Sequence, residues 1–392
     1  MEKDDTEGRY GGYFRRAGKQ TMQLTQRQIN YCMECGVCTG SCPVSYEWND
    51  FSPRQIIKRT LIDEDESFLG CRELWACLSC ARCSTRCPVT IDFPEFIRTY
   101  RNQARREDFH PQESHHGVLQ TITALQTADI QQKRTDWTRD VGSIKDSGDV
   151  FYFVGCLPYF ESAFSYLHLS PLDSARSILT LLNNMGIEPV VSDEERCCGH
   201  DPLWSGNEEL FRKLARINMD LITGSGAKTV LFGCPEGYLT FKRHYAQEFG
   251  PLPFEVLHVT EFLARELPQS GLSFQADGHG PVTYHDPCRL GRWLGIYEQP
   301  RQVLGRIQDL DFREMDRNRE NATCCGTSAW MECSSCSRAM QWDRLQEAAQ
   351  TGAGTLITSC PKCQIHFTCA KETAGVELDI MDIYAYLNQC LK

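Results

Sequence analysis

The sequence has no long hydrophobic run. No stretch reaches the roughly 18 consecutive apolar residues that a membrane-spanning helix needs. The first residues, MEKDDTEGRYGG, lack the apolar segment of a secretory signal. These absences predict a cytoplasmic protein without a direct membrane span.

Positive charge is in short supply. The 392 residues include 41 Lys and Arg against 52 Asp and Glu, which gives a formal net charge of −11. A balance of this sign argues against nucleic acid as the main partner. The sequence also contains no G-x-G-x-x-G that follows a strand and opens a helix. We therefore expect any flavin or nicotinamide to be bound by a partner protein.

Cysteine, by contrast, is abundant, with 22 residues. A disulfide scaffold would explain such a number, but disulfide scaffolds are usually short, secreted chains. This chain is long, has no export signal and groups its cysteines in tight motifs. Metal ligation explains that grouping better than disulfides do.

Two cysteine runs near the N-terminus share the spacing C-x2-C-x2-C-x3-C-P. This is the spacing of two-cluster bacterial ferredoxins, in which three close thiolates bind one [4Fe–4S] cubane and the fourth reaches the other cluster. Zinc sites more often use two separated pairs. The first predicted ligand set is Cys32, Cys35, Cys38 and Cys87, and the second is Cys77, Cys80, Cys83 and Cys42.

The residues around these runs predict helices. After a tail over residues 1–20, we expect a helical ferredoxin domain over residues 21–110, with helices in SPRQIIKRTLI and DFPEFIRTYRNQARRE. The second helix carries a basic cluster that we interpret as a solvated face, with a docking role as the alternative, namely Arg98, Arg101, Arg105 and Arg106.

A polar linker is expected over residues 111–148. Val118, Ile122 and Leu125 fall at helical spacing and predict a helix there. The nearby histidines have no cysteine or carboxylate pattern around them, so we interpret them as surface residues: His110, His115 and His116.

The rest of the chain is an internal repeat, over residues 149–275 and 276–392. FYFVGC pairs with VTYHDPC, RCCGHDPLW with TCCGTSAW, and TVLFGCPEG with TLITSCPKC. Short apolar strands, including EPVVS, alternate with helices such as SPLDSARSILTLLNNMG, which predicts parallel strands with crossover helices. The carboxyl ends of parallel strands share one edge, where four cysteines should gather: Cys156, Cys234, Cys288 and Cys360.

The predicted fold is therefore an α+β multidomain chain. An α-helical ferredoxin domain with two [4Fe–4S] clusters comes first. Two repeated α/β units with parallel sheets follow.

The pattern C-x(n)-C-C-G-x(n)-C-x-x-C resembles the cysteine-rich (CCG) domain of heterodisulfide reductases. The domain order is similar to a fused catalytic subunit of that family. The resemblance implies an unusual non-cubane [4Fe–4S] cluster bound by five cysteines, which carries the disulfide chemistry in heterodisulfide reductases. The second unit has all five, namely Cys288, Cys324, Cys325, Cys360 and Cys363.

The first unit departs from the pattern, because Gly237 stands where the fifth cysteine would be. It keeps Cys156, Cys197, Cys198 and Cys234. Four thiolates are the usual number for a cubane. Three alternatives therefore stay open: a cubane or altered cluster, a copy without any cluster, and a non-cubane cluster completed by another ligand such as Glu236.

Other side chains near these motifs allow more than one role. Cys333 and Cys336 form a C-x-x-C pair, either a redox dithiol or zinc pair or, as we prefer, two free thiols. His285 is either a core residue or a residue that hydrogen-bonds the cluster or passes protons. Cys71 lies outside both ferredoxin runs and is expected in the core.

The resemblance implies an iron–sulfur electron-transfer subunit of a larger anaerobic oxidoreductase, working with a flavoprotein and other iron–sulfur subunits. A class II benzoyl-coenzyme A reductase complex is one specific candidate. The alternatives are a catalytic thiol–disulfide reductase subunit of the heterodisulfide type and the iron–sulfur subunit of a quinone-linked dehydrogenase.

Overall fold

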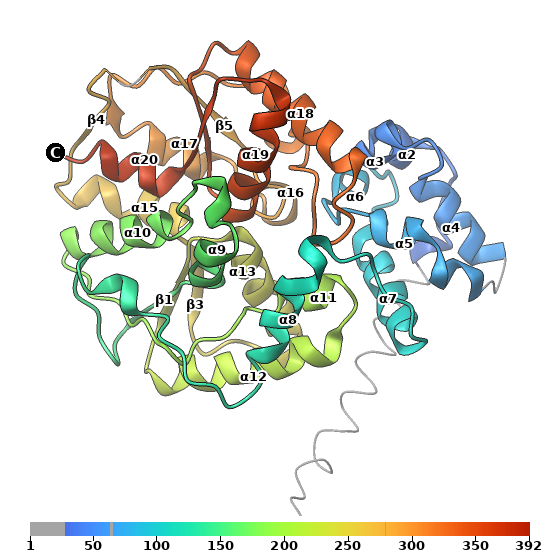
Figure 1. Cartoon of the computed structure of the whole chain (residues 1–392), viewed down its shortest axis with the longest axis horizontal. Helices are drawn as coiled ribbons and strands as arrows, with labels where there is room; N and C mark the ends of the chain where they lie inside the picture. The colour runs from blue at the N-terminus through green and yellow to red at the C-terminus, as the bar shows by residue number, and fades with distance from the viewer. Residues whose placement is uncertain (1–27, 63–65, 279) are drawn as a thin grey trace, which may run out of the picture.

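The computed structural model describes residues 28–62, 66–278 and 280–392. A helical ferredoxin domain lies beside two α/β units (Figure 1). The expected tail over residues 1–20 lies outside the described residues. No helix within the described residues is long and apolar enough to cross a membrane.

Short helices separated by cysteine-bearing turns make up the ferredoxin domain. They are α2 (Val37–Ser41), α3 (Pro43–Glu47), α4 (Pro53–Ile62), the 3-10 helix η1 (Glu66–Gly70), α5 (Arg72–Ala76), α6 (Arg82–Thr85) and α7 (Phe93–Arg106). Proline suits the first helical turn because its missing N–H would have no partner there, and α3 and α4 both begin with one. Asp92 caps α7 by accepting a hydrogen bond from the Glu95 N–H. Both helices predicted for this domain are thus present, as α4 and α7.

The basic cluster on α7 is solvated at Arg106, but the prediction of a solvated face is wrong for Arg98, Arg101 and Arg105. Arg101 is fully buried. Its guanidinium donates at 2.7–2.9 Å to four main-chain carbonyls, those of Leu74, Trp75, Cys77 and Trp204. Arg98 is also buried and pairs with Glu95 and Glu208. The cluster faces the first CCG unit, where packing brings carbonyls and carboxylates that the local sequence does not reveal.

The linker contains the predicted helix, but its buried face is displaced by one position. Helix α8 (Val118–Leu125) exposes Val118 and Leu125 and buries Leu119 and Thr123. Two 3-10 helices flank it, η2 (Ser114–Gly117) and η3 (Asp136–Thr138). The histidines interpreted as surface residues are all exposed, namely His110, His115 and His116.

Each α/β unit is built on a three-stranded parallel sheet, as predicted. The first sheet has the order β1 (Val150–Phe153), β2 (Thr229–Phe232), β3 (Glu255–His258), and the second has the order β5 (Val282–His285), β7 (Thr355–Thr358), β8 (Asp379–Asp382). The expected strand in EPVVS is reduced to single bridges at Val190, one of them to Phe151 of β1. Phe312 makes the equivalent bridge to Val282 of β5. A small parallel pair, β4 (Phe274–Gln275) and β6 (Ile307–Gln308), lies apart from both sheets.

Helices connect and cover the strands in both units. The first unit has α9 (Leu157–Ala163), η4 (Ser165–Leu167), α10 (Leu172–Asn184), α11 (His200–Trp204), α12 (Glu208–Gly224), α13 (Pro235–Leu239), the π-helical segment η5 (Thr240–Tyr245), α14 (Ala246–Phe249), α15 (Val259–Glu266) and η6 (Leu267–Gln269). The second unit has α16 (Gly291–Leu294), α17 (Glu298–Leu304), η7 (Arg319–Asn321), α18 (Ser335–Gln350), α19 (Pro361–Ala374) and α20 (Ile383–Gln389).

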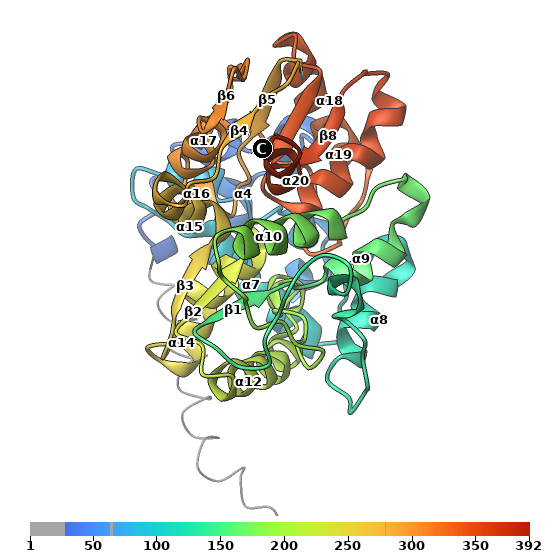
Figure 2. The ribbon, with the colours of Figure 1, turned by 90° about the vertical axis from the view of Figure 1, so that its left-hand side faces the viewer.

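The two units face each other across a pseudo-twofold axis. Helix α10 packs against α20, and α15 packs against α17 (Figure 2). In the repeat, α10 corresponds to α17 and α15 corresponds to α20, so the two contacts are equivalent. Leu182 and Ile383 belong to one apolar core that crosses this boundary. Burial of that shared apolar surface holds the units in a fixed relation.

Replacing Arg101 by Met should destabilise the fold strongly. Four buried carbonyls would lose their donor, and each unpaired buried group costs about 1–3 kcal/mol. We expect a loss of at least ~3 kcal/mol in urea unfolding of the anaerobically prepared protein. Arg106→Met is the matched control, because Arg106 is exposed on the same helix. Equal stability of the two variants would contradict the structural role of Arg101.

Asp382 should make stability depend on pH. Burial raises the pKa of Asp382 to about 7, whereas the unfolded value is about 3.9. Between these values the folded chain holds a proton that the unfolded chain has released, so stability falls as pH rises from about 4 to 7.

Asp382→Asn should remove this part of the pH dependence and stabilise the protein above pH 7 by a few kcal/mol. Asparagine keeps the cap of α20, which Asp382 makes by accepting from the Tyr384 N–H. Urea unfolding at pH 5 and pH 8 measures the difference, and Asp379→Asn, at an exposed position on the same strand, is the control. A variant that follows the wild-type pH profile would refute the assignment.

Candidate metal centres

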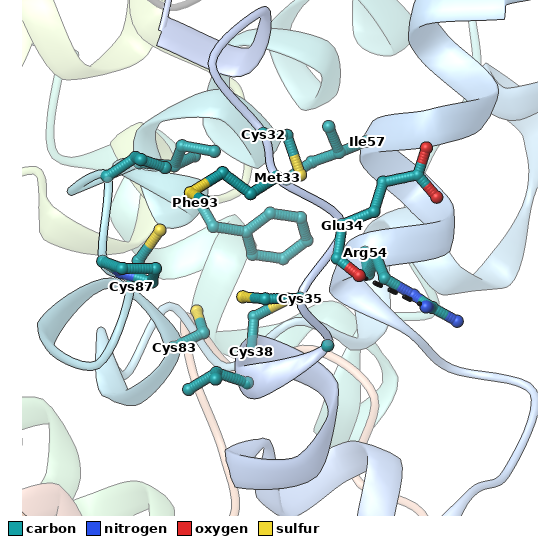
Figure 3. A pocket seen from close by; sticks show the side chains of 15 residues that line it. Cys32, Met33, Glu34, Cys35, Cys38, Arg54, Ile57, Cys83, Cys87 and Phe93 are labelled. Carbon is teal, nitrogen blue, oxygen red and sulfur yellow. Dashed lines mark hydrogen bonds between the residues drawn. The ribbon is translucent and has the colours of Figure 1, made fainter.

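The first predicted ligand set of the ferredoxin domain lies around one apolar hollow. Cys32, Cys35 and Cys38 come from the turn into α2 and from that helix, and Cys87 follows α6 (Figure 3). Gly36 stands in the left-handed region at φ 78°, which allows the tight turn between these cysteines. Cys35 is exposed, and Cys32, Cys38 and Cys87 are half-buried. This site therefore lies at the protein surface.

The second predicted set lines another hollow, deeper in the domain. It consists of Cys42, Cys77, Cys80 and Cys83. The structure thus brings the last cysteine of each run to the other run, as the ferredoxin spacing predicts. Burial raises the pKa of the Cys42 thiol to about 12. A metal would have to displace a proton there, since the thiolate is the form that binds.

In the second CCG unit, five cysteines converge from three separate segments. Cys288 follows β5, Cys324 and Cys325 form the turn before α18, and Cys360 and Cys363 lie at the start of α19. The Cys324 thiol contacts those of Cys288 and Cys325. The Cys363 thiol contacts those of Cys325 and Cys360. All five predicted residues therefore meet in one place.

The second ferredoxin site and the second CCG unit touch directly. The thiols of Cys80 and Cys324 are in contact, and this contact is the first cause of a lowered pKa of Cys80. Arg292 donates to the Cys80 carbonyl at 2.7 Å. Trp293 and Arg289 both donate to the Ser79 carbonyl. These main-chain contacts attach the ferredoxin loop to the segment after Cys288.

In the first CCG unit, the four remaining cysteines also converge. Cys156, Cys197, Cys198 and Cys234 line one cavity. The Sγ atoms of Cys156 and Cys197 are 3.7 Å apart. A Cβ atom added to Gly237 would lie 3.8 Å from the Cβ of Cys198. Position 237 therefore faces Cys198, as Cys363 faces Cys325 in the other unit.

A buried charge network fills the boundary between the two CCG sites. Lys362 lies between Cys360 and Cys363 in the sequence. Its ammonium group is 2.6 Å from the Glu236 carboxylate. It also pairs with Asp201. Glu236 and Lys362 occupy equivalent positions in the repeat. Each is two residues after the cysteine that follows a strand, Cys234 after β2 and Cys360 after β7. The pseudo-twofold axis thus brings two equivalent positions with opposite charges into contact.

His200 completes this network. Its Nε2 accepts from the Arg289 guanidinium at 3.2 Å, so its proton is on Nδ1 and points to Asp201 and Glu236. His200, Asp201 and Glu236 could together hold a cation, since their ligand atoms lie within 4.8 Å of one another. The Lys362 ammonium already pairs with both carboxylates, so Glu236 is not free to complete a cluster.

The sequence prediction missed Lys362, Asp201 and His200. The sequence did contain a sign of the Glu236–Lys362 pair, because aligning the two repeats places these residues of opposite charge at the same position. It did not reveal that the two positions meet in space. His366 was also missed, and its Nδ1 lies 3.5 Å from the Cys325 sulfur.

His285 is buried beside the second CCG unit. Its Nδ1 accepts a hydrogen bond from Arg344, and among the described residues its Nε2 has no partner. Burial lowers the pKa of His285 to about 3. The imidazole is therefore neutral at physiological pH.

Five cysteines lie outside these sets. Cys333 and Cys369 are exposed, Cys336 and Cys71 are half-buried, and Cys390 is buried. All 22 cysteines lie within the described residues, and none forms a disulfide.

The chemistry of the four sites fits iron–sulfur clusters. Each site offers four or five thiols, and apart from His200, Asp201 and Glu236 in the first CCG unit its cavity or contacts include few other ligand groups. Cationic side chains lie nearby, including Arg101, Arg289, Arg292 and Lys362. Positive charge and N–H donors offset the negative charge that thiolate-ligated clusters carry.

Comparison with known proteins agrees with this geometry. Residues 28–91 match the 4Fe-4S dicluster domain family, and residues 150–242 and 282–368 each match the cysteine-rich domain family CCG. A dicluster domain implies two [4Fe–4S] cubanes in the N-terminal part of the chain.

Individual relatives are redox proteins. A component of the dihydromethanophenazine:CoB–CoM heterodisulfide reductase of Methanosarcina barkeri is 31% identical over 268 residues, which cover 67% of this chain and 63% of the relative. A component of the CoM/CoB fumarate reductase of Methanothermobacter marburgensis is 26% identical over 92% of this chain and 72% of the relative. The EtfAB:quinone oxidoreductase of Syntrophomonas wolfei is 29% identical over 54% of this chain and 30% of the relative. The match thus spans less than two thirds of the heterodisulfide reductase component.

The Glu236–Lys362 pair should behave as a coupled unit. Lys362→Met would leave two buried carboxylates without their cation and should cost on the order of 3–5 kcal/mol in urea unfolding. The double variant Glu236→Gln with Lys362→Met should recover a substantial part of that loss, because one unpaired charge is removed. Lys213→Met, which breaks the exposed pair with Glu209, is the control and should have little effect. Additive losses in the double variant would contradict direct pairing.

Proposed function

Since this chain belongs to the heterodisulfide reductase-like iron–sulfur proteins, with one 4Fe-4S dicluster domain and two CCG domains, we propose that it is the electron-transfer component of a larger oxidoreductase complex. The order of its cysteine sites in space supports this role. Electrons would pass between the ferredoxin domain at the surface and the CCG sites in the interior.

Ligand assignments follow from the cysteines that converge. Cys32, Cys35, Cys38 and Cys87 would hold one cubane, and Cys42, Cys77, Cys80 and Cys83 the other. Cys288, Cys324, Cys325, Cys360 and Cys363 would hold a non-cubane [4Fe–4S] cluster. When bound, these clusters supply one-electron redox centres within a single chain. We assign the helical ferredoxin domain to residues 21–110, the linker to 111–148, and the CCG units to 149–275 and 276–392.

The contact between Cys80 and Cys324 is the observation that carries the proposal. It joins the second ferredoxin site to the second CCG unit without any intervening side chain. Cys360 of that unit in turn interacts electrostatically with Cys234 of the first unit. The four sites therefore follow one another as a chain, with the complete CCG site between the ferredoxin and the first CCG unit. Such a sequence of neighbouring redox sites suits a conductor of electrons.

We assign an ordinary four-cysteine cluster to the first CCG unit. Its four thiols still converge on one cavity, although the fifth is missing. Four thiolates are the usual number for a cubane. Glu236 is held by Lys362, which disfavours it as the substitute ligand for a non-cubane cluster.

A partner must supply the two-electron chemistry. The sequence has no motif for a flavin or nicotinamide nucleotide. We infer a flavoprotein partner together with other iron–sulfur subunits. A quinone-linked complex is a second form of the same proposal, supported by the similarity to an EtfAB:quinone oxidoreductase. Membership of a class II benzoyl-coenzyme A reductase complex is a finer hypothesis that rests on the resemblance alone.

Catalysis of thiol–disulfide reduction is the other candidate function. The similarity to a heterodisulfide reductase component favours it. Two features of the chain weaken it. Gly237 removes one of the ten cysteines that two complete CCG sites would have, and the Glu236–Lys362 pair fills the space between the two sites.

Iron content tests the cluster assignments. Four clusters predict about 16 irons per chain in anaerobically prepared protein. Cys363→Ala should lower this value towards 12 if only the non-cubane cluster is lost. Gly237→Ala is the control at the equivalent position: the added Cβ crowds the Phe232 ring, at 3.1 Å, but the variant removes no thiol, so the iron content should stay unchanged. A wild-type value near 12 would mean that the first unit holds no cluster, and a value near 8 that Cys363→Ala leaves unchanged would refute both CCG assignments.

Reduced methyl viologen separates the two functions on the same preparations. A conductor should accept electrons, seen as bleaching of the cluster absorbance, and show no turnover with a small disulfide. Disulfide turnover that Cys363→Ala abolishes would instead establish the reductase.

A further inference from the structure

Two equivalent positions of the repeat carry histidine and threonine in opposite order. The first position is the second residue after the Cys-Cys pair, and the other lies three residues after the last cysteine position of the motif. The second CCG unit has Thr327 and His366 there, whereas the first unit has His200 and Thr240. A histidine therefore stands at the later position only in the unit that has all five cysteines.

His366 lies against the sulfur of a predicted cluster ligand. Helix α19 carries Cys363 and His366 three residues apart, which places both on one face of the helix. The His366 Nδ1 is 3.5 Å from the Cys325 sulfur. His366 is only 7% exposed, so little water competes for this contact. The geometry suits a hydrogen bond from an imidazole N–H to the sulfur, and burial strengthens such a bond.

The Thr327 hydroxyl is placed to fix the proton of His366. Its oxygen lies 2.7 Å from Nδ1 and 2.9 Å from Nε2, so it can pair with either nitrogen. A cysteine sulfur that binds a cluster has lost its proton and can only accept a hydrogen bond. Nδ1 must then carry a proton where it faces Cys325, and the Thr327 hydroxyl can donate to Nε2.

A loop with a strained backbone holds the Trp330 ring against His366. The two rings meet edge to face, with their centroids 5.1 Å apart. Ala329 and Trp330 have φ values of 52° and 53°, in the left-handed region that is unfavourable for residues other than glycine. The linker stabilises this conformation, since the Ser114 N–H and hydroxyl, both at 2.8 Å, and the Gln120 amide, at 3.0 Å, donate to the Trp330 carbonyl. Strain of this kind is concentrated at functional sites.

The first CCG unit has no counterpart of this contact within the described residues. Thr240 is fully buried, and its hydroxyl donates at 2.7 Å to the Glu236 carbonyl of the same helical segment. His200 pairs with Asp201 and Glu236. In the described part of the chain, only the second unit thus offers an imidazole nitrogen to a cysteine sulfur.

We propose that His366 donates a hydrogen bond to the cluster-bound sulfur of Cys325 and thereby raises the reduction potential of the cluster in the second CCG unit. One-electron reduction adds one negative charge to a cluster and its thiolates, and a hydrogen bond to a ligand sulfur stabilises that charge. His366 acts through Cys325 and does not itself bind iron. This inference rests on the proposed cluster assignment, and it adds the residue that sets one of the potentials.

Anaerobic redox titration followed by electron paramagnetic resonance tests the hydrogen bond. The signal of the second-unit cluster is identified as the one that Cys363→Ala abolishes. In His366→Leu, which removes the donor, the midpoint potential of this signal should fall by roughly 59 mV, a tenfold change in a one-electron equilibrium and the effect of about one hydrogen bond. His366→Asn keeps an N–H close to the position of Nδ1 and should retain most of the wild-type potential.

His110→Leu is the matched control, because His110 is exposed and pairs with Asp108. It should leave the potential unchanged, and the other clusters should keep their potentials in every variant. If His366→Leu loses iron, Thr327→Val provides the test. It retains His366 and removes the hydroxyl that donates to Nε2, so a smaller fall in the potential is expected.

The outcomes separate this inference from the cluster assignment. An unchanged potential in His366→Leu, or in Thr327→Val where that variant is needed, would overturn the role of His366. An equal fall in His366→Asn, or a parallel fall of all the cluster potentials, would overturn it as well. Absence of any signal that depends on Cys363 would overturn the cluster assignment itself, and this inference with it.

Discussion

Three buried guanidinium groups hold the second ferredoxin cysteine run against the CCG units, and the relative positions of the cysteine sites depend on them. Arg101, Arg289 and Arg292 donate to main-chain carbonyls between residues 74 and 80. A loop that wraps thiols around a cluster cannot pair its own carbonyls in regular structure, and buried carbonyls need donors. The arginines supply these donors and bring positive charge to a region of many thiolates. Docking of the domains and electrostatic compensation thus come from the same side chains.

The repeated unit solves the problem of gathering cysteines from distant parts of the chain. Parallel strands end at one edge, so Cys156, Cys234, Cys288 and Cys360 each follow a strand of their sheet. The two equivalent helix contacts across the pseudo-twofold axis, α10 with α20 and α15 with α17, then bring the cysteine-bearing edges of the two sheets together. At that boundary, identical charged side chains at the two equivalent positions of the repeat would repel each other. Glu236 opposite Lys362 replaces that repulsion by an ion pair.

The largest disagreement between local pattern and tertiary packing concerned polar side chains. The sequence predicted that Arg98 and Arg101 lie on a solvated face, because four basic residues grouped on one helix are usually exposed to solvent. They are buried because carbonyls and carboxylates of segments more than twenty residues away lie against them. Helix α8 was predicted correctly, yet its buried side is one position from the expected one, because Gln126, just after the helix, accepts from the Cys197 N–H at 2.7 Å and turns that side inward. Short-range periodicity carries no information about such partners.

The sequence by itself determined the helical ferredoxin domain, the exchange of Cys42 and Cys87 between the two runs, the parallel-sheet repeat and the two sets of CCG cysteines. These features follow from spacing along the chain, and spacing restricts what a local segment can form. Only the tertiary structure decided that the cysteine site of the second CCG unit is in contact with the second ferredoxin site, through Cys80 and Cys324. It also decided that Lys362 meets Glu236 and that His366 lies against the Cys325 sulfur. Such contacts join residues up to hundreds of positions apart, and their choice depends on how whole surfaces pack together.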